Sequence, residues 1–404
     1  MNEQERHREI PELKKDKPAV SKRAKRLRVL IVAPSMDILG GQAVQAARLV
    51  ARFREEPSLD VSFLPINPRL PGVLRRLQAI KYVRTIVTSV AYLLSLLTRV
   101  RSYDVIHIFS ASYFSFVLAP TPAVLVAKLY GKGTVLNYRS GEAEDHLQRW
   151  RRTAVPTVRL FDRIVVPSGY LVDVFARFGL RAHSIFNFVD TNRFRFRERR
   201  PLRPLFLSNR NLESLYNVAC VLRAFALIQH RFPEAELTIA GDGSQRAELE
   251  SLAQELNLKN ATFVGRVPPE GMPALYDAAD IYLNSPNIDN MPGSVIEAYA
   301  SGLPVVTTDA GGIPYIVRNE ETGLLVARDD HERMAEGAIR LLEDQSFACA
   351  MAARAHEECR HYAWTAVRDE WLKLYEEVHT TGGHETNGVE VNGEIAGNQK
   401  VVSG

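Results

Sequence analysis

Residues 284–315 read NSPNIDNMPGSVIEAYASGLPVVTTDAGGIPY, and this stretch decides how the second half of the chain folds. It begins at the end of an apolar run that predicts a strand, and continues into a polar loop. A proline-glycine turn then predicts a short helix over residues 294–300. Gly302 is placed to end that helix, because glycine adopts the left-handed conformation without strain. An apolar run at 305–308 predicts the next strand.

The same stretch has the chemistry of a binding site. Free backbone N–H groups at the start of a helix bind anions, and phosphate is the usual one. The pair Gly311-Gly312 lets a ligand approach the backbone closely. Glu297 lies one turn inside an otherwise apolar helix, and a buried carboxylate needs a partner such as the vicinal hydroxyls of a sugar. The alternative is a capped helix whose Glu297 side chain faces water.

Length and charge narrow the class of protein. The chain has 404 residues, of which 46% are hydrophobic, and a net charge of +4. This length favours two globular domains. Residues 1–28 carry ten Lys or Arg against five Asp or Glu, so the basic excess belongs to this tail and the remainder is near neutral. A near-neutral body argues against nucleic-acid binding, which requires a basic face.

The two ends of the chain lack the patterns of folded elements. Residues 1–26 are charged and aperiodic, residues 380–404 are rich in Gly, Asn and Glu, and we expect both to be disordered. The charged start shows no signal peptide. The longest uncharged helical run, residues 85–98, is expected to be too short to span a bilayer. Three cysteines without a C-x-x-C pair indicate small core residues in a reducing compartment: Cys220, Cys349 and Cys359.

Apolar strand-like runs alternate with helical segments along the chain, which is typical of parallel sheets covered by helices. In the first half the strands are predicted at 27–33, 61–66, 104–109, 134–138, 163–167 and 184–186. In the second half they are predicted at 205–208, 236–240, 262–264, 281–284, 305–308 and 323–326. Between the two series, residues 190–204 are basic, contain proline and break the pattern, so the linker is predicted within this segment.

We therefore predict an α/β protein with two doubly wound domains. The N-terminal domain covers residues 27–190, the linker 191–204 and the C-terminal domain 205–360. A last helix over 361–379 carries Trp and Tyr residues at helical spacing, so we expect it to pack back on the N-terminal domain. Ligands of such sheets bind at the carboxyl ends of the strands, so the cleft between the domains is the expected site.

Three features of the first half bear on function. Gly40-Gly41 form a turn after the first strand but lack the full G-x-G-x-x-G pattern. His107 lies near the end of the third strand, where it is either catalytic or a satisfied core residue. Residues 72–101 mix basic and apolar side chains on a helical pattern. Such a helix either contacts a membrane surface or packs on the sheet and exposes a basic edge, and we favour the second.

Together these motifs resemble the GT-B glycosyltransferases, and specifically the retaining family four, the glycosyl transferases group one. The resemblance covers about residues 27–379, and its strongest part, DNMPGSVIEAYASGLPVV at 289–306, matches the family's E-x(7)-E block. Shorter supporting matches are GG at 40–41, DVIH at 104–107, NFVD at 187–190, AGDGS at 240–244, FVGRV at 263–267 and TGLLV at 322–326. The resemblance implies two Rossmann-like domains that face each other across a cleft.

The resemblance also implies residue roles. Glu297 matches the carboxylate that holds the ribose hydroxyls, Asp289 matches the acidic residue that faces the transferred sugar, and Arg210 matches a basic residue that neutralises the diphosphate. The catalytic candidates are Asp289, Glu297 and His107. The donor-binding candidates are Gly40, Gly41, Arg210, Arg266, Val267, Asn290, Met291, Pro292, Gly293, Ser294 and Glu297.

The chain departs from the family pattern at three positions. Asp289 is shorter than the usual Glu, which is expected to alter reach and donor choice. Tyr216 stands where a Lys is common, so one phosphate charge is left for Arg266 or the Gly40-Gly41 turn to compensate. Phe109 stands where a second His is common, and Arg139 is expected to substitute for it, so these two residues are the acceptor-side candidates.

The function implied is that of a hexosyltransferase, as in polysaccharide biosynthesis. It would move a sugar with retention from a nucleoside-diphosphate sugar to a hydroxyl of a glycan, a lipid-linked acceptor or a small molecule. The sequence has no D-x-D pair and no metal-ligand cluster, so neither a metal nor another cofactor is expected. The alternatives are a sugar-nucleotide epimerase and a non-catalytic nucleotide-sugar-binding protein. We expect a cytoplasmic protein, with a peripheral contact at the inner membrane surface if the acceptor is lipid-linked.

Overall fold

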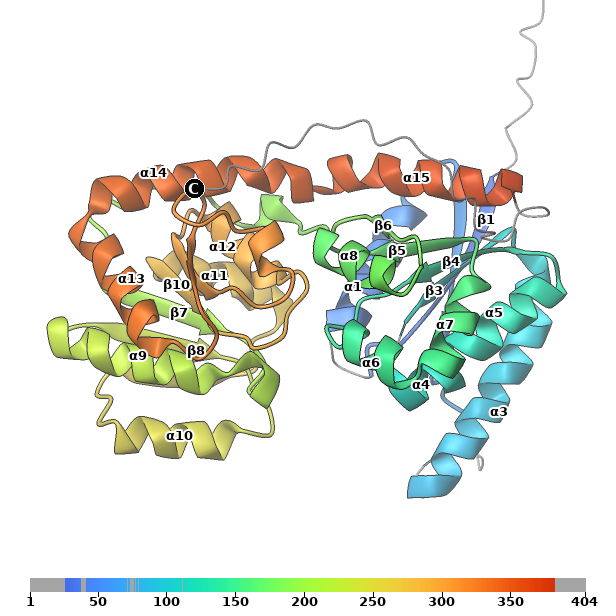
Figure 1. The fold of residues 1–404 in the computed structure, drawn as a ribbon, viewed down its shortest axis with the longest axis horizontal. Coiled ribbons are helices and arrows are strands. Elements are labelled where there is room, and N and C mark those ends of the chain that lie inside the picture. Colours follow the sequence, from blue (N-terminus) through green and yellow to red (C-terminus); the bar gives the residue numbers. More distant parts are fainter. Residues whose placement is uncertain are drawn as a thin grey trace, which may run out of the picture.

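The structure is a computed structural model and describes residues 26–37, 41–70, 72, 76, 78, 80–110 and 112–381. These residues form two α/β domains that are joined by the linker and by the last helices of the chain (Figure 1). The tails that the sequence predicts to be disordered lie almost entirely outside the described residues.

The N-terminal domain is built on a parallel sheet of the order β2-β1-β3-β4-β5-β6. Its strands are β1 (Leu27–Ala33), β2 (Leu59–Pro65), β3 (Val105–Phe109), β4 (Gly133–Asn137), β5 (Arg163–Val166) and β6 (His183–Ser184). Its helices are α1 (Gly41–Arg54), α3 (Lys81–Arg99), α4 (Tyr113–Leu118), α5 (Pro120–Leu129), α6 (Ala143–Arg149), α7 (Arg151–Arg159) and α8 (Gly169–Arg177). The central strands are buried on both faces, which explains their continuous apolar runs.

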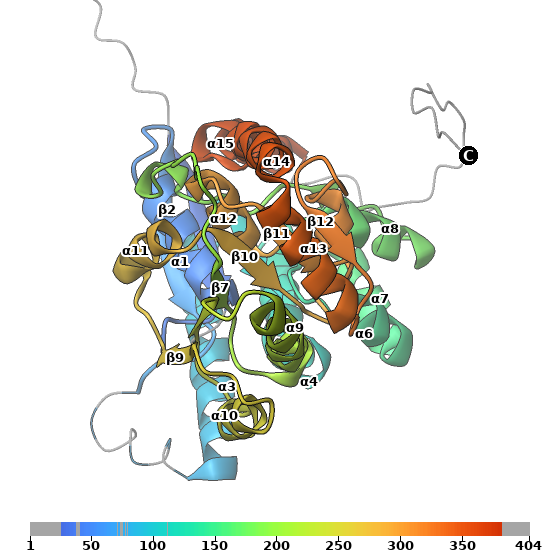
Figure 2. The ribbon, with the colours of Figure 1, turned by 90° about the vertical axis from the view of Figure 1, so that its left-hand side faces the viewer.

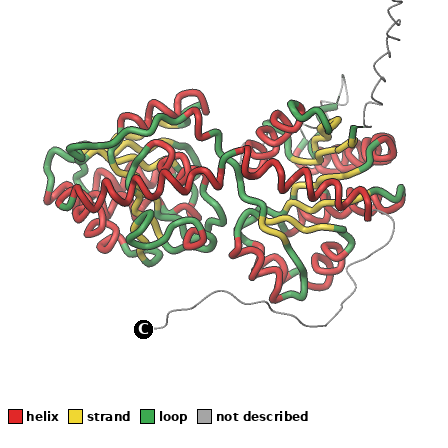
Figure 3. The backbone as a smooth tube through the Cα atoms, turned by 90° about the horizontal axis from the view of Figure 1, so that it is seen from above, coloured by secondary structure: helices red, strands yellow, loops and turns green. Residues whose placement is uncertain are grey.

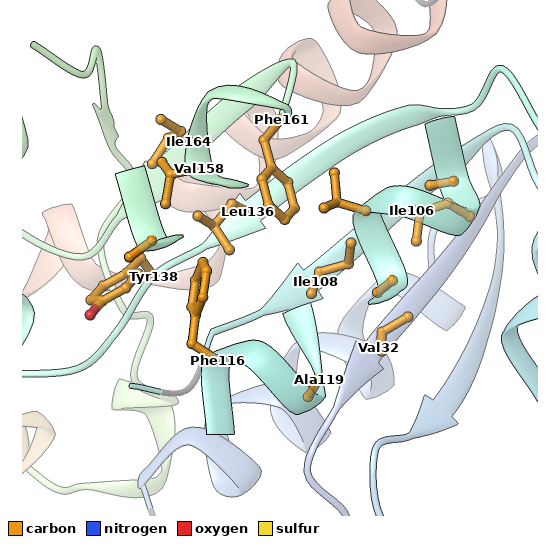
Figure 4. Packing of buried hydrophobic residues seen from close by; sticks show 14 of the residues in the cluster. Val32, Ile106, Ile108, Phe116, Ala119, Leu136, Tyr138, Val158, Phe161 and Ile164 are labelled. Atoms are coloured by element: carbon orange, nitrogen blue, oxygen red, sulfur yellow. The ribbon is translucent and has the colours of Figure 1, made fainter. Parts of the chain in front are cut away.

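Each face of this sheet has its own core. On one face, side chains such as Val32, Ile108 and Leu136 pack with Phe116 of α4 and Phe161 after α7 (Figure 4). The other face carries the alternate strand residues and is covered by α1 and by α15 (Trp364–Thr381). The strand residues alternate between the faces because successive side chains of a strand point in opposite directions.

The C-terminal domain repeats this design with the sheet order β12-β11-β10-β7-β8-β9. Its strands are β7 (Leu205–Asn209), β8 (Glu236–Ala240), β9 (Ala261–Gly265), β10 (Ile281–Asn284), β11 (Val305–Thr308) and β12 (Leu324–Val326). Its helices are α9 (Val218–Arg231), α10 (Arg246–Glu255), α11 (Met272–Ala278), α12 (Gly293–Ser301), α13 (His331–Glu343) and α14 (Gln345–Glu358). Helices α9 and α13 lie side by side on one face (Figures 1 and 2), whereas α11 and α12 cover the other.

The end of the chain returns to the first domain. Helix α14 lies along the C-terminal domain and α15 continues across to the N-terminal domain (Figures 1 and 3). Trp371 and Tyr375 of α15 are fully buried against the N-terminal sheet, where both rings contact Phe53 of α1. The last helix is therefore part of the core of the first domain, which ties the two domains together.

The predicted fold class and most predicted elements are confirmed, with differences at element ends. The helical segment that follows β7 is divided by Asn217, whose left-handed backbone (φ 45°, ψ 47°) separates a short 3₁₀ turn from α9. Asn tolerates that conformation better than most residues with a Cβ atom. Within the stretch predicted as one helix over 72–101, the described α-helix begins at Lys81 and ends at Arg99.

The apolar segment around α3 is longer than the run of residues 85–98 named in the sequence. Residues 83–102 are long and apolar enough to cross a membrane by length and composition, with a mean hydropathy of 1.4. The expectation that this run is too short was therefore wrong by that measure. One such helix among the described residues is weak support for a span, because Tyr92, Leu96 and Val100 pack in the core of the domain.

Candidate functional site

The organising stretch places the start of α12 at the carboxyl edge of the C-terminal sheet. Strand β10 ends at Asn284, the polar loop follows, and α12 begins at Gly293 with no side chain capping its N-terminus. The Val295 N–H donates to the Pro292 carbonyl at 3.2 Å, whereas the Gly293 and Ser294 N–H groups precede any helical carbonyl that they could reach. Gly302 ends the helix in the left-handed conformation (φ 74°), as predicted. Every residue from Ser294 to Ser301 is buried, so this helix start is held rigidly.

The loop before α12 is shaped by the second glycine pair. The Gly312 N–H donates to the Asp289 carbonyl at 2.9 Å. A Cβ atom on Gly312 would lie 1.9 Å from the Asn290 carbonyl oxygen, and Gly311 has a φ of +54° next to the Asp289 carbonyl. Only glycine fits such a close backbone approach. The glycine pair therefore positions the acidic loop rather than leaving open space for a ligand at these two atoms.

Arg210, just after β7, faces this loop. Its Nη2 donates to the Asp289 carboxylate and its Nη1 donates to Ser294 Oγ at 3.1 Å. The guanidinium carbon lies 4.1 Å from the centre of the Tyr216 ring. Burial lowers the pKa of Arg210, but the Asp289 carboxylate together with Tyr216 and Tyr282 outweighs burial and raises that pKa above its ordinary value. A fixed cation thus stands beside the start of α12, and Tyr216 packs against it where the family resemblance expects a Lys.

Glu297 lies deeper, one turn along α12. Its Oε2 accepts from the Tyr276 hydroxyl at 3.0 Å, and that hydroxyl accepts from Asn209 Nδ2 at 2.7 Å. Its Oε1 lies 3.7 Å from Nη2 of Arg48, which comes from α1 of the other domain. Burial raises the pKa of Glu297 above its ordinary value, although Arg48 and the Tyr276 hydroxyl oppose that shift. The carboxylate is therefore buried, poorly compensated and directed toward the interface between the domains.

Sequence reasoning did not find Arg48, Tyr276 or Asn209. Asn209 carried a weak signal, because a polar residue beside Arg210 at a strand end points to a site. Arg48 and Tyr276 carried none, because their helical surroundings look like those of any surface arginine or core tyrosine.

Several contacts join the two domains around the site. Asn290 Nδ2 donates to the Arg139 carbonyl at 3.1 Å. The Asn187 backbone N–H points at the sulfur of Met291, 3.1 Å away. On the outer side of the interface, the Tyr315 hydroxyl donates to the Asp173 carboxylate at 2.6 Å. Asn290 and Met291 of the candidate loop thus contact the N-terminal domain directly.

His107 lies in the core rather than in the cleft. It is fully buried, its Nδ1 lies 2.6 Å from the Tyr375 hydroxyl, and its Nε2 accepts from Asn137 Nδ2 at 2.9 Å. Its ring stacks between Phe109 and Trp371. Burial, aided by nearby positive charge, holds the pKa of His107 well below its ordinary value. The geometry therefore favours the core alternative, because both ring nitrogens are already engaged, and a catalytic role of His107 stays a prediction.

The remaining candidates are spread more widely. Phe109 is buried beneath the Arg139 guanidinium, whose carbon lies 5.4 Å from the Phe109 ring centre. Arg266 and Val267 follow edge strand β9, and Arg266 is exposed. Gly41 is the first residue of α1, whereas Gly40 lies outside the described residues. Within the described part of the chain, no group of three or more His, Cys, Asp or Glu residues is arranged to hold a metal ion.

Comparison with known proteins places this site in a family. Residues 190–358 match the family model described as "Glycosyl transferases group 1". Residues 190–358 thus form a domain of the group 1 glycosyl transferase type. The family predicted from the motifs is confirmed for this domain, which contains Arg210, Asp289 and Glu297.

The curated relatives match over the same part. The chain is 32% identical over 178 residues to a D-inositol 3-phosphate glycosyltransferase of Corynebacterium urealyticum, which is 42% of this chain and 42% of the relative. It is 30% identical over 167 residues to a phosphatidyl-myo-inositol mannosyltransferase of Mycobacterium leprae, which is 41% of this chain and 44% of the relative. The chain thus spans about two fifths of the length of the curated relatives it matches.

Solved structures extend the likeness of the fold to both domains. Anabaena HepE in complex with UDP-glucose matches with a TM-score of 0.70 at 16% identity, over 87% of this chain and 100% of HepE. Sucrose-phosphate synthase from Thermosynechococcus elongatus matches with a TM-score of 0.71 at 20% identity, over 88% of this chain and 100% of the synthase. The group 1 domain and the domain before it therefore share the two-domain GT-B fold, as predicted.

Proposed function

We propose that this protein is a retaining glycosyltransferase that uses a nucleoside-diphosphate sugar as its donor. One observation carries the proposal: a fixed arginine, an open helix start and a buried carboxylate follow one another across the group 1 domain. This order matches the order of a diphosphate and a ribose in the donor. The solved neighbours that contain UDP or UDP-glucose support the same assignment.

Glu297 is the proposed partner of the ribose. A carboxylate accepts hydrogen bonds from both hydroxyls of a vicinal diol, which gives charge-assisted bonds of the stronger kind. Burial raises the pKa of the Glu297 carboxylate, and among the described residues Tyr276 is the one side chain that donates a hydrogen bond to it within 3.5 Å. Binding a diol would therefore satisfy a group that the protein alone leaves under-compensated.

Arg210 and the start of α12 are the proposed partners of the diphosphate. Donors that are fixed before the reaction stabilise the charge that develops on a leaving group. Arg210 now divides its fork between Asp289 and Ser294. We infer that the diphosphate, which carries more negative charge than a carboxylate, accepts these hydrogen bonds of Arg210 in place of Asp289. The Asp289 carboxylate is then free to orient the sugar.

The proposed chemical step needs no covalent enzyme intermediate. The bond between the anomeric carbon and the diphosphate oxygen breaks, and the acceptor oxygen attacks that carbon from the same face. The acceptor proton passes to the departing phosphate oxygen. If Asp289→Asn transferred sugar at the wild-type rate, the orienting role would be wrong.

Metal independence is also a proposal, and it rests on a charge already present. The Arg210 guanidinium stands where the departing diphosphate would lie, and α12 adds the positive end of its dipole. We expect the enzyme to transfer sugar at the same rate with and without EDTA. A rate restored only by a divalent ion would contradict it.

The first experiment is thermal unfolding with UDP-, GDP-, ADP- and TDP-glucose. A donor at about 100 times its dissociation constant should stabilise the folded protein by roughly 2.7 kcal/mol. Glu297→Ala should lose that shift, while the same change at the exposed Glu336 of α13 should keep it. No shift with any donor would favour a non-catalytic role.

Product analysis then separates transfer from epimerisation. In the absence of an acceptor, slow hydrolysis of an α-linked donor should release the sugar as its α anomer, which NMR detects before mutarotation. Release of the β anomer would exclude retention. A changed sugar that is still attached to its nucleotide would favour an epimerase.

The outer face of α3 supports an acceptor at a membrane surface. Ile86, Val90, Leu93 and Leu94 form one stripe and are 67%, 53%, 41% and 58% exposed. Leu125 and Leu129 of the adjacent α5 are also exposed. Helix α3 has basic residues and no acidic residue. An apolar stripe with basic flanks suits the surface of an anionic bilayer, so we propose a peripheral contact there for a cytoplasmic enzyme of polysaccharide or glycolipid synthesis.

A further inference from the structure

Arg139 is a charged residue whose surroundings do not account for its charge. It follows β4 at the carboxyl edge of the N-terminal sheet, whereas Arg210 follows β7 in the C-terminal sheet. Its Nε donates to Asn137 Oδ1 at 2.8 Å, but its Nη1 atom is buried and has no hydrogen-bond partner. Among the described residues, no Asp or Glu forms an ion pair with it.

An unpaired guanidinium in such a place is costly. A buried charge is normally compensated by an ion partner or by a full set of hydrogen bonds. Here burial alone acts on the group and lowers the pKa of Arg139 to about 9. The ring of Phe109 lies 5.4 Å from the guanidinium carbon, which gives a favourable but weak contact. The part of the chain that the structure describes therefore holds a positive group at Arg139 for which it supplies no Asp or Glu partner.

Asn290, which contacts Arg139, and Ser168, which lies near Asn290 at Gly312, are polar residues with unsatisfied side-chain atoms. Asn290, which is 5% exposed, donates from Nδ2 to the Arg139 carbonyl, while its Oδ1 is buried without a partner. Ser168, which is 1% exposed, precedes α8, and its Oγ is also buried without a partner. Ser168 and Asn290 both approach Gly312: its ideal Cβ would lie 3.0 Å from Ser168 Oγ and 1.9 Å from the Asn290 carbonyl oxygen. The unsatisfied atoms thus come from both domains around one part of the interface.

We propose that Arg139 forms a subsite for an anionic group, a carboxylate or a phosphate, on one of the sugar substrates. A guanidinium binds either group through two parallel hydrogen bonds, which suits a residue with a free Nη1. The donor diphosphate already has Arg210 and the start of α12, so Arg139 is left for a second anion. The subsite rests on the proposed function, because it assumes that a sugar binds at this interface between the domains.

Two substrates could supply the anion, and they share the same chemistry. An acidic or phosphorylated acceptor would place its charge there, and so would the carboxylate of a uronic acid donor. A neutral sugar would leave the guanidinium unpaired and would therefore bind more weakly than a charged sugar. The subsite is therefore expected to select for charge rather than for the identity of the sugar.

Binding of small probes to the full chain tests this inference. Dissociation constants are measured by calorimetry for glucose 6-phosphate, glucuronate and glucose, with and without the nucleoside diphosphate found by the melting panel. UDP-glucuronate and UDP-glucose form a second pair. In at least one of these two sets of probes, we expect an anionic compound to bind about tenfold or more tightly than the neutral compound. One charge-assisted hydrogen-bonded contact with Arg139 should give a difference of that size.

Three variants complete the test. Arg139→Gln should abolish the preference for the anionic probe and leave binding of the neutral probe and of the nucleotide unchanged. Arg139→Lys should retain part of the preference, which separates loss of charge from a failure to fold. Arg149→Gln, at an arginine of α6 whose side chain is 72% exposed, should behave as wild type.

The outcomes separate this inference from the proposed function. A preference in the free sugars assigns the anion to the acceptor, and a preference in the nucleotide sugars assigns it to the donor. Equal binding of charged and neutral probes, or a preference that survives Arg139→Gln, overturns the subsite. Nucleotide binding without any preference would leave the proposed function standing, whereas failure of every nucleotide would refute that function whatever the probes show.

Discussion

Replacement of Glu297 by Gln should weaken nucleotide binding while leaving the empty protein at least as stable as the wild type. The side chain is 9% exposed, so the amide would occupy the same buried position. Tyr276 can still donate to the amide oxygen of Gln, and Arg48 would lose only a contact of 3.7 Å. The change therefore removes the charge and keeps the shape.

The size of the loss in affinity follows from the bonds to the ribose. A hydrogen bond to a charged group contributes about 1.5–3 kcal/mol, and one between neutral groups about 0.5–1.5 kcal/mol. For two hydroxyls the difference is about 2–3 kcal/mol, which is roughly 30- to 150-fold in the dissociation constant.

The effect on stability has the opposite sign and depends on pH. Burial raises the pKa of Glu297 above its ordinary value of 4.5, so folding favours the protonated form. That contribution to stability is fully present below the unfolded pKa and is lost as the pH rises through the folded pKa. Gln behaves like the protonated form at every pH. The melting temperature of Glu297→Gln minus that of wild type should therefore increase as the pH rises above about 4.5.

Two measurements check this prediction. Calorimetric titration with the nucleotide from the melting panel gives the affinities, and melting curves between pH 4 and pH 8 give the stabilities. Glu336→Gln, on the exposed face of α13, is the matched control and should change neither quantity. A dissociation constant within threefold of wild type would refute the role of Glu297. A variant that melts below wild type at neutral pH would refute the claim that the buried charge is under-compensated.

Three further perturbations test the fold, the membrane surface and the loop. Asp280→Ala removes a fully buried carboxylate that pairs with three arginines. Unfolding by urea should therefore show that the free energy of unfolding falls by about 3–5 kcal/mol. A loss as small as that of the control Asp277→Ala, at an exposed residue, would contradict the role of the cluster. Because the arginine hydrogen bonds outweigh burial and lower the pKa of Asp280, its contribution should be present above pH 3.8 and be lost as the pH falls through the folded pKa. Leu94→Glu should reduce sedimentation with anionic vesicles about tenfold or more while Leu227→Glu, on the C-terminal domain, leaves it unchanged; equal sedimentation of both variants would exclude α3 as the contact. Gly312→Ala places a methyl group 1.9 Å from a carbonyl oxygen of the acidic loop, so calorimetry should show a lower nucleotide affinity. An affinity equal to that of the wild type would mean that the loop moves to accommodate the methyl group without any effect on binding.

The organising stretch shows why so much of the fold could be predicted. Strands β10 and β11 begin and end at the predicted residues, and Gly302 ends the helix between them in the left-handed conformation. These features depend on interactions between near neighbours in the chain: apolar period, backbone sterics and the absence of a Cβ atom. Element ends were less well predicted where a longer contact decides them, as at Asn217, whose amide donates to the Asp329 carboxylate.

The site could be predicted only in part, because its residues meet across long distances in sequence. Motif resemblance pointed to Arg210 and Asp289, but their pairing joins positions 79 residues apart. His107 shows the limit most clearly. From its strand position it could serve catalysis, yet Tyr375, 268 residues later, and the stacked Trp371 hold it in the core.

The sequence by itself determined the succession of strands and helices, the two domains and the family of the second one, since these follow from local pattern and from motifs with fixed spacing. Only the tertiary structure decided which charges meet. It placed Arg48 beside Glu297 and Arg210 against Asp289, and it left Arg139 without an acidic partner among the residues that it describes. The reason is physical: whether a charge is compensated depends on burial and on groups brought from other elements, and neither leaves a mark in the sequence around the charged residue.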